Sequence, residues 1–393
     1  MSGGGTPPPL GGGLPATPSS PPHFHFELLA EDVETGARRG RLHTPHGAIE
    51  TPVFMPVGTL GSIKAVGPDD LERLGAQVVL GNTYHLMLRP GEGLIKRLGG
   101  LHRFMAFGGA LLTDSGGFQV YSLAQRRKIS EEGVHFASHI DGRAIFLSPE
   151  TSMGIQEALG ADIIMAFDEC PPMGVGEAYL EDSLARTTRW LHRCHGAWRE
   201  REKQALFGIV QGGLSEVLRK RHAEEICAVE LPGYALGGFS VGEEVEEMRA
   251  GVAYGAGLLP RGRPRYLMGV GAPGDLVAGV CAGVDMFDCV LPTRCARTGL
   301  LFTSEGKLNI RNARYQEDER PLDAQCGCYT CRTFSRAYLR HLFQSREILA
   351  LRLNSLHNLH FLLGLMGEMR KAIEGGYMKT FVREFLSRPA SPP

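Results

Sequence analysis

The chain has 393 residues, of which 43% are hydrophobic and 22% are charged, and its formal net charge is −1 at pH 7. This length allows one large domain or two ordinary ones, and a charge near zero means that a nucleic-acid partner would need a local basic patch. No apolar run approaches the ~18 residues that span a bilayer. The N-terminus has neither the basic start nor the apolar stretch of a secretory signal, so we expect a cytoplasmic protein without a membrane partner.

The two ends of the chain differ in composition from the rest. Residues 1–22 contain six Gly and seven Pro, which cannot bury enough apolar surface to offset the entropy lost on ordering. We therefore expect a disordered tail at 1–22, a flexible tail at 387–393 and one folded domain at 23–386.

Eight short apolar runs recur along the folded part, at 52–57, 78–80, 110–112, 163–167, 206–210, 234–236, 266–270 and 284–287. Helix-like segments lie between most of them, at 68–74, 148–159, 179–204, 214–228, 243–258 and 274–282. Continuous apolar strands that alternate with helices predict a parallel sheet covered on both faces. Eight such units over about 250 residues predict the α/β class and a (β/α)8 TIM barrel.

The residues that follow these strands are polar or glycine-rich. The last six runs continue into segments at 114–119, 168–170, 211–213, 237–239, 269–271 and 288. In a barrel of this kind the carboxyl ends of the strands build the active site. Turn glycines and helix-capping aspartates would explain one such segment, but six of them predict a shared site.

A doubly wound open sheet is the alternative fold. Its phosphate-binding loop would be a glycine-rich turn after the first strand. The segment at 58–62, Gly-Thr-Leu-Gly-Ser, lacks the spacing of that fingerprint, and the chain has no P-loop motif. We therefore favour the barrel.

Two carboxylates lie at the end of the eighth run. An ionised Asp away from water is costly unless it is paired or hydrogen-bonded, so each needs a partner or a function. Asp285 and Asp288 are three residues apart, and strand alternation sends their side chains to opposite faces. We expect Asp288 to face a substrate and Asp285 to have a structural role, with Pro292 ending the strand.

A cysteine cluster follows the barrel. Three of the nine cysteines lie within six residues, at Cys326, Cys328 and Cys331, which favours a metal site in a reducing compartment over a disulfide framework. The candidates for a fourth ligand are His357, His360 and His341. Three thiolates and one imidazole complete a tetrahedral Zn²⁺ shell with no open position, so we expect one structural zinc in a zinc-binding subdomain at about 300–360.

The region around this cluster is basic. Residues 294–352 carry eleven Arg and Lys against six Asp and Glu. A positive surface around a zinc site suits a phosphate backbone, although charged surfaces are usually only solvated.

Six motifs resemble those of the tRNA-guanine transglycosylases. They are DSGGFQ at 114–119, FDEC at 167–170, GIVQGG at 208–213, GGFSVGE at 237–243, DMFDCVLPTR at 285–294, and the cysteine cluster with its distant His. The resemblance spans residues 24–386. It implies a zinc-containing (β/α)8 barrel that exchanges the guanine at the wobble position of certain tRNAs for a 7-deazaguanine.

The resemblance also implies roles for individual residues. Asp288 would be the nucleophile and Asp114 the proton acceptor. The base would be bound by Asp114, Ser115, Gly116, Gly117, Phe118, Asp168, Gln211, Gly238 and Met268. The metal would be one Zn²⁺ per subunit, held by Cys326, Cys328, Cys331 and His357.

The RNA partner is implied in the same way. Contacts would come from Gly269, Val270, Gly271, Ala272, Pro273, Gly274 and Asp275, and from Thr293, Arg294, Cys295, Ala296 and Arg297. The expected substrates are the tRNAs of the Asp, Asn, His and Tyr type, whose anticodon loops share a U-G-U context. Members of the family commonly form homodimers, so we expect one here.

Two further positions concern the incoming base. Cys170 and Val241 resemble bacterial members, which predicts use of guanine and 7-aminomethyl-7-deazaguanine (preQ1). The alternatives are a queuine-inserting enzyme, a non-catalytic tRNA-binding partner subunit, and a barrel hydrolase that breaks N-glycosidic bonds with water. Both Asp114 and Asp288 are present, which argues against the non-catalytic subunit, and the basic region around the cysteines argues against the hydrolase.

Overall fold

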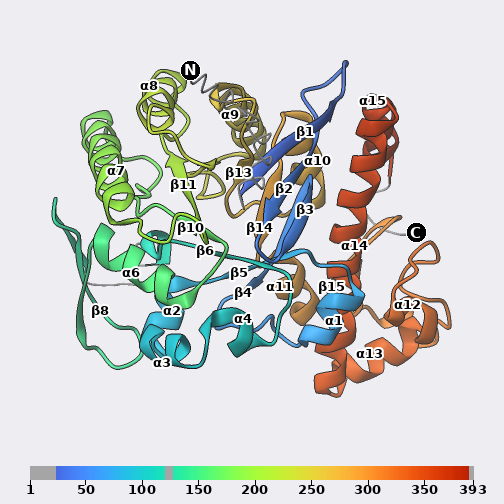
Figure 1. Cartoon of the computed structure of the whole chain (residues 1–393). Coiled ribbons are helices and arrows are strands. Elements are labelled where there is room, and N and C mark those ends of the chain that lie inside the picture. The colour runs from blue at the N-terminus through green and yellow to red at the C-terminus, as the bar shows by residue number, and fades with distance from the viewer. Residues whose placement is uncertain (1–23, 120–126, 389–393) are drawn as a thin grey trace, which may run out of the picture.

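The computed structural model describes residues 24–119 and 127–388. A closed barrel of eight parallel strands forms its centre (Figure 1). In chain order these strands are β4 (Val53–Gly58), β5 (Val78–Gly81), β6 (Ala110–Thr113), β10 (Ile163–Met165), β11 (Ala205–Val210), β12 (Gly233–Leu236), β13 (Arg265–Leu267) and β14 (Met286–Cys289). The barrel closes where β14 pairs in parallel with β4. The predicted (β/α)8 fold and all eight predicted strands are confirmed.

The strands read as continuous apolar runs because both of their faces are buried. In β4, Val53 and Met55 belong to the core inside the barrel, whereas Phe54 between them belongs to the core under the helices. The same alternation separates Leu206 from Phe207 in β11. Inward and outward residues therefore alternate along each strand, as a packed barrel interior requires.

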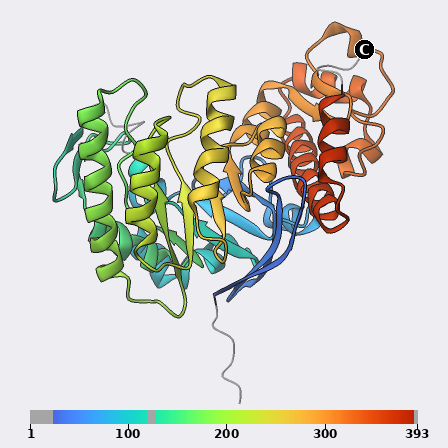
Figure 2. The ribbon, with the colours of Figure 1, turned by 90° about the horizontal axis from the view of Figure 1, so that it is seen from above.

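Helices surround the barrel, and Figure 2 shows long helices side by side along its outer face. The helices around the barrel are α1 (Pro68–Arg73), α2 (Thr83–Leu88), α3 (Glu92–Arg97), α4 (Gly100–Met105), α6 (Pro149–Leu159), α7 (Glu177–Ala197), α8 (Glu216–Cys227), α9 (Val245–Leu258) and α10 (Pro273–Cys281). The expectation that α7 runs to residue 204 is wrong. Trp198 is extended and buried, and its indole N–H donates to the carbonyl of Gln204 at 3.1 Å.

Several strands outside the barrel were not predicted. They are β1 (His25–Glu31), β2 (Arg38–Thr44), β3 (Gly47–Thr51), β7 (Arg127–Ile129), β8 (Val134–Ala137), β9 (Ala144–Leu147), β15 (Leu300–Thr303) and β16 (Gly306–Asn309). All of them pair antiparallel. Most are exposed on one face and so lack the continuous apolar character of the barrel strands.

A hydrogen-bonded cluster fastens the β2–β3 turn to the amino-terminal end of the barrel. The buried Asp162 accepts hydrogen bonds from His46 at 2.7 Å, from His102 at 3.0 Å and from the N–H of Leu111 at 2.7 Å. The two imidazoles stack with their centres 3.6 Å apart and their planes 15° apart. An ion between them would lie outside both ring planes, where the nitrogen lone pairs do not point, so we interpret this cluster as a structural clamp.

The C-terminal part packs against the barrel strand β4, against β1 and β2, and against α10. It comprises α11 (Leu291–Thr298), a 3-10 helix η1 (Ala313–Tyr315), α12 (Tyr329–Thr333), α13 (Arg336–Gln344), α14 (Ile348–Glu374) and α15 (Met378–Leu386). Asn358 of α14 donates to the carbonyls of Pro292 and Leu300 at 2.9 and 3.1 Å, which joins α14 to both ends of α11. Within the described part of the chain, no helix has the length and apolar character needed to cross a membrane. The tail predicted at 1–22 lies outside the described residues, as does 389–393 of the second tail.

Candidate active site

A pocket of 540 Å³ opens at the carboxyl ends of the barrel strands. Every barrel strand, or a residue within three positions of its end, contributes to the wall. The pocket brings together many of the residues singled out in the sequence: Asp114, Ser115, Phe118, Asp168, Cys170, Gln211, Gly238, Val241, Met268 and Asp288. The carboxylates of Asp114, Asp168 and Asp288 thus share one cavity, as the six polar strand endings suggested.

Asp288 lies in β14 with one of its carboxylate oxygens already hydrogen-bonded. The hydroxyl of Tyr266 donates to its Oδ1 at 2.6 Å, and the N–H of Gly269 donates to the same oxygen at 2.8 Å. Burial raises the pKa of Asp288, and these two donors oppose that rise. Because both donors use Oδ1, Oδ2 is the oxygen left to meet a ligand.

Asp285 has a different environment. It is fully buried and forms an ion pair with Arg38, with 3.1 Å between Oδ2 and Nη2. The N–H of Arg265 also donates to it at 2.8 Å. These contacts tie β2 and β13 to the start of β14, which agrees with the structural role expected for Asp285.

Asp114 follows β6 and accepts three hydrogen bonds. Asn82 donates to Oδ2 at 2.6 Å, Gln119 donates to Oδ2 at 3.0 Å, and the N–H of Thr83 donates to Oδ1 at 3.0 Å. Burial raises the pKa of Asp114 to about 7, and the charge of Asp288 adds to this rise. A carboxyl group with this pKa can both donate and accept a proton at neutral pH.

Asp168 follows β10 and faces Gln211. The amide of Gln211 donates to Asp168 Oδ2 at 2.7 Å, and the hydroxyl of Ser115 donates to Oδ1 at 3.3 Å. Burial raises the pKa of Asp168 to about 6. Among the described residues the buried Oε1 of Gln211 has no hydrogen-bond partner, so a ligand N–H would satisfy it.

Three glycines allow close approach near this pocket: Gly238, which lines it, and Gly116 and Gly117 in the segment after β6. A Cβ on Gly117 would lie 2.6 Å from the carbonyl oxygen of Asp168, and a Cβ on Gly238 would lie 2.5 Å from Oε1 of Gln211. Gly116 and Gly238 also have positive φ angles of 84° and 73°, which favour glycine. Phe118 beside them is 46% exposed, so its ring can cover a ligand rather than fill the core.

Cys170 and Val241 also lie on the pocket wall. Burial raises the pKa of the Cys170 thiol to about 12, so it is an uncharged wall residue rather than a nucleophile. The carboxylate of Glu243 accepts the N–H of Val241 at 2.9 Å and also that of Ser240. Cys170, Val241 and Gly238 thus belong to the lining of the same pocket.

The two segments predicted to contact RNA lie at the rim. Four residues of the first segment and its final Asp275 line the pocket, and Asp275 is paired with Arg249 at 2.8 Å. The second segment lies on α11. Arg294 and Arg297 are exposed there, whereas the remaining side chains of that segment are buried, namely Thr293, Cys295 and Ala296. The expectation that Pro292 ends the strand is wrong, because β14 ends at Cys289 and Pro292 lies in the first turn of α11.

Comparisons with known proteins identify the family of the chain. A family model described as queuine tRNA-ribosyltransferase matches residues 32–391. A queuine tRNA-ribosyltransferase of Bacillus subtilis (strain 168) is 53% identical over 365 residues, which cover 93% of this chain and 96% of that protein. The chain belongs to the tRNA-guanine transglycosylase family. The protein of the same description from Halothermothrix orenii is 56% identical over 363 residues, covering 92% of this chain and 97% of that protein. The chain is therefore a transglycosylase enzyme, for which the family implies a tRNA substrate.

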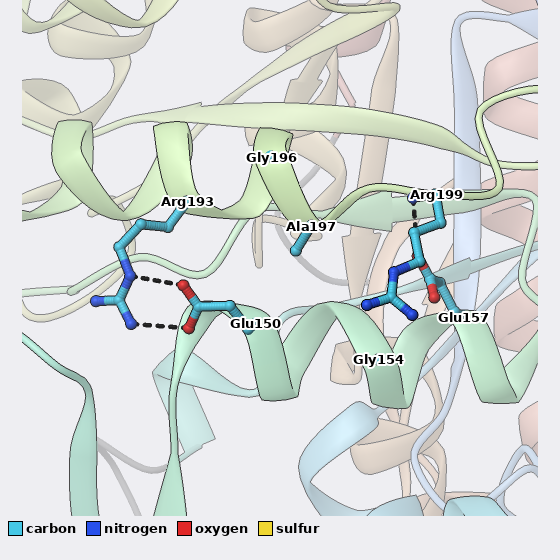
Figure 3. A pocket seen from close by; sticks show the side chains of 7 residues that line it. All are labelled: Glu150, Gly154, Glu157, Arg193, Gly196, Ala197 and Arg199. Carbon is cyan, nitrogen blue, oxygen red and sulfur yellow. Dashed lines mark hydrogen bonds and ion pairs between the residues drawn. The ribbon is translucent and has the colours of Figure 1, made fainter.

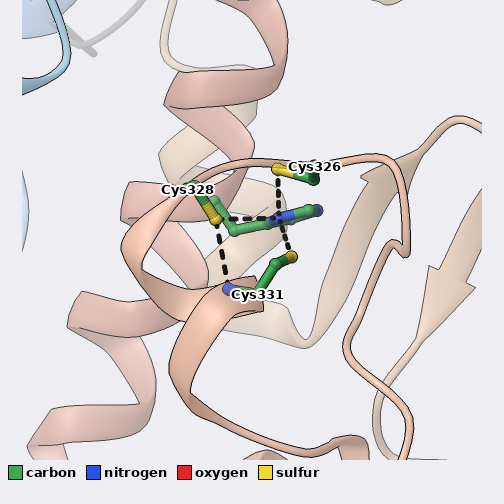
Figure 4. A group of neighbouring side chains, drawn as sticks. Cys326, Cys328 and Cys331 are labelled. Carbon is green, nitrogen blue, oxygen red and sulfur yellow. Dashed lines mark hydrogen bonds between the residues drawn. The ribbon is translucent and has the colours of Figure 1, made fainter.

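The transglycosylase also has a metal-binding group beside α14. Nδ1 of His357 lies 3.7, 3.6 and 3.3 Å from the sulfurs of Cys326, Cys328 and Cys331, and Figure 4 shows the three thiols converging. Nε2 of His357 lies 2.7 Å from the carbonyl of Phe302. That contact fixes the ring so that Nδ1 faces the thiols, as is usual for a ligating imidazole. His360 approaches Cys326 alone, at 3.5 Å.

Two pocket residues of the transglycosylase, Asn82 and Tyr266, were missed in the sequence, and Gln119 was included there only as part of the 114–119 segment. Asn82, Gln119 and Tyr266 all hold one of the two carboxylates, Asp114 or Asp288. Asn82 directly follows β5, and the strand-end argument would have found it if it had been applied to that strand. Nothing in the sequence indicated a functional role for Tyr266, because an aromatic residue in a barrel strand is equally well explained as part of the hydrophobic core.

A second cavity lies on the outside of the barrel, between α6 and α7 (Figure 3). Its volume is 390 Å³, and Glu150 and Arg193 pair across one end of it at 2.7 Å. Arg193 holds the pKa of Glu150 down to about 2. Within the described ranges, none of the site residues predicted from the sequence lines this second cavity.

Proposed function

We propose that this transglycosylase exchanges the guanine at the wobble position of tRNA for preQ1, through a covalent enzyme–ribosyl intermediate. The observation that carries the proposal is the pair of carboxylates, Asp288 and Asp114, in one pocket beside a group of base-binding residues. Their charges interact across the pocket. A double displacement at an anomeric carbon requires a nucleophile and a proton carrier in the same pocket.

In the first half-reaction Oδ2 of Asp288 attacks C1′ of the ribose. The C1′–N bond breaks, its electron pair goes to the purine, and the protonated carboxyl group of Asp114 gives its proton to the departing guanine. Tyr266 and Gly269 hold Oδ1 of Asp288, which fixes the direction of the attacking oxygen. The target base must leave the anticodon stack to reach this depth.

In the second half-reaction preQ1 replaces guanine in the pocket. The carboxylate of Asp114 accepts the proton of the attacking ring nitrogen, which forms the new bond to C1′ while the ester to Asp288 breaks. Two displacements retain the ribose configuration. The proton that Asp114 gave away is recovered, so the cycle needs no further reactant.

Base recognition in this proposal is divided among three groups. Asp168 is an acceptor for the N–H edge of guanine, and the unpartnered Oε1 of Gln211 can accept a further N–H. The close approach at Gly238 lets a backbone N–H reach the carbonyl oxygen of the base. Phe118 and Met268 would cover its flat faces.

The size of the pocket supports preQ1 over queuine. Cys170 and Val241 both stand on the wall near Gly238, where a substituent on the 7-deazaguanine ring would have to fit. Their side chains would oppose the cyclopentenediol of queuine and leave room for an aminomethyl group. Queuine insertion is therefore the alternative that the substrate experiment must exclude.

The exposed face of α11 and the rim of the pocket would receive the anticodon loop. Arg294 lines the pocket and Arg297 lies three residues further along the helix, so both can reach phosphates or base edges. The expected tRNAs are of the Asp, Asn, His and Tyr type with a U-G-U loop, in the cytoplasm. We also keep the expected homodimer as part of this proposal.

The donor set of the Cys3His group fits Zn²⁺. Cys326, Cys328, Cys331 and His357 would hold it as four ligands, a closed tetrahedral shell that gives a structural cross-link and no catalytic position. It would fasten the loop before α12 to α14, and so stabilise the basic region next to α11.

The test is incubation with unmodified wobble-guanosine tRNA and labelled guanine, preQ1 or queuine in turn. We expect incorporation of guanine and of preQ1, with queuine excluded. Release of guanine without incorporation would indicate a hydrolase. Binding of tRNA without either event would indicate a non-catalytic subunit, and equal use of queuine would overturn the preQ1 assignment.

A further inference from the structure

Arg219 of α8 is a buried cation behind the base-binding part of the pocket. Its side chain is 1% exposed, in a helix whose sequence, EVLRKRHAEEIC, resembles a solvated surface helix. Among the described residues it has no ion-pair partner, and Glu243 acts on it only at a distance. A charge buried without a counter-ion is costly, so its position requires a compensating function.

The N–H groups of the guanidinium all donate to backbone carbonyls. Nε and Nη2 donate to Gly213 at 3.2 and 2.6 Å, Nη1 donates to Val210 at 3.2 Å, and both Nη atoms donate to Gly237 at 3.3 Å. These five contacts use all five N–H donors of an arginine. They join the end of β11 to the end of β12 at the positions that immediately precede Gln211 and Gly238.

This arrangement sets the direction of a backbone donor. In a planar trans peptide the C=O and N–H groups point in opposite directions. Because Arg219 holds the carbonyl of Gly237, the N–H of Gly238 is directed away from Arg219. Nη2 of Arg219 would lie only 4.0 Å from a Cβ at Gly238, so the guanidinium stands directly behind this peptide unit.

The cation is held firmly and stays charged. The guanidinium carbon lies 4.0 Å from the centre of the Phe239 ring, a cation–π contact that offsets part of its desolvation. A Cβ on Gly212 would lie 2.7 Å from Cα of Arg219, so the loop after β11 packs directly on α8. Burial lowers the pKa of Arg219 to about 9, which leaves it cationic at neutral pH.

We propose that Arg219 is a positioning and specificity residue, which orients and polarises the Gly238 N–H so that the pocket selects a base with a carbonyl oxygen at that point. A positive charge on the carbonyl side of a peptide strengthens its N–H as a donor in a low dielectric. The favoured ligands are therefore 6-oxopurines and their 7-deaza analogues over 6-aminopurines. This inference rests on the proposed function, since it takes Gly238 as a base-binding residue.

The test compares guanine with 2,6-diaminopurine, which replaces the 6-oxygen by an amino group, as competitors of labelled guanine exchange and as ligands in direct binding. We expect Arg219→Met to reduce the preference for guanine at least about tenfold, the equivalent of one charge-assisted hydrogen bond, while KM for tRNA changes little. Arg38→Met is the matched control. It removes another fully buried arginine, so it should lower stability and leave the preference unchanged.

Arg219→Lys covers the case in which the Met variant does not fold. Lysine keeps the charge but has three donors on a single atom and cannot bridge all three carbonyls. We expect KM for guanine to rise about fivefold or more, a loss on the scale of one neutral hydrogen bond, with KM for tRNA little changed. A wild-type KM for guanine in this variant, or a wild-type preference in Arg219→Met, would overturn the role of Arg219. If the unmodified enzyme itself failed to bind guanine, the proposed function would fail instead.

Discussion

Asp285 and Asp288 provide a sharp test of the site, because two carboxylates three residues apart should respond in opposite ways to the same substitution. Asp285→Asn leaves the fully buried Arg38 without a counter-charge. Breaking a buried pair in this way costs about 3–5 kcal/mol. Asp288→Asn keeps an oxygen acceptor for Tyr266 and Gly269 and removes a charge that burial disfavours, so stability should be equal or higher.

Activity should show the reverse pattern. An amide cannot form the ribosyl ester, so Asp288→Asn should lower guanine exchange by at least about 10³-fold, as removal of a nucleophile does in other enzymes. Asp285→Asn should keep most of its exchange activity per folded molecule. Urea unfolding followed by fluorescence gives the stability, and incorporation of labelled guanine into tRNA gives the activity.

Two outcomes would refute this reasoning. Full exchange activity in Asp288→Asn would show that Asp288 is not the nucleophile. A loss of exchange by Asp285→Asn as large as that of Asp288→Asn, in protein shown to be folded, would mean that the two carboxylates do not have the separate roles that their contacts indicate.

Four further predictions concern the proton, the metal, the incoming base and the RNA. The pKa of Asp114 is raised to about 7 and the first step needs its proton, so kcat/KM for tRNA should fall as the pH rises through that value. If Asp114→Asn had the same pH profile as the unmodified enzyme, Asp114 would not be the proton donor. Cys328→Ser should lose the bound zinc in elemental analysis and Cys227→Ser, outside the cluster, should not. Val241→Gly should let queuine compete with preQ1, and unchanged exclusion would refute the pocket-size argument. Arg294→Ala should raise KM for tRNA and reduce its salt dependence by about one ion, whereas a wild-type salt dependence would remove Arg294 from the RNA surface.

The barrel could be predicted because its strands are buried on both faces. A run such as the one ending at Leu112 has no polar position, and nothing but a covered parallel sheet explains eight of them. The strands β1 to β3 were missed for the opposite reason. Phe26 is buried while its neighbours His25 and Glu27 are exposed, and seven residues of mixed character do not stand out in a single sequence.

The site could be predicted only where it depends on strand order. Asp114, Asp168 and Asp288 lie at the carboxyl ends of the third, fourth and eighth barrel strands, and the barrel brings them together without any detail of packing. The hydroxyl of Tyr266 and the guanidinium of Arg219 depend on the direction of a side chain within the folded core, which local pattern does not specify. Arg219 in particular lies in a charged helical sequence, and its burial follows from the loops that close over α8.

The proposed mechanism also explains why two interacting carboxylates can share a buried pocket. Before attack Asp288 is ionised and its charge, with burial, favours the protonated form of Asp114. Once Asp288 is esterified to ribose its charge is gone, and Asp114 has given its proton to guanine and is ionised instead. The pocket thus contains one negative charge of this pair in both states, and each step moves the charge between the two residues. Loss of the Asp288 charge removes one of the interactions that raise the pKa of Asp114, so Asp114 gives up its proton more readily in the step that forms the intermediate.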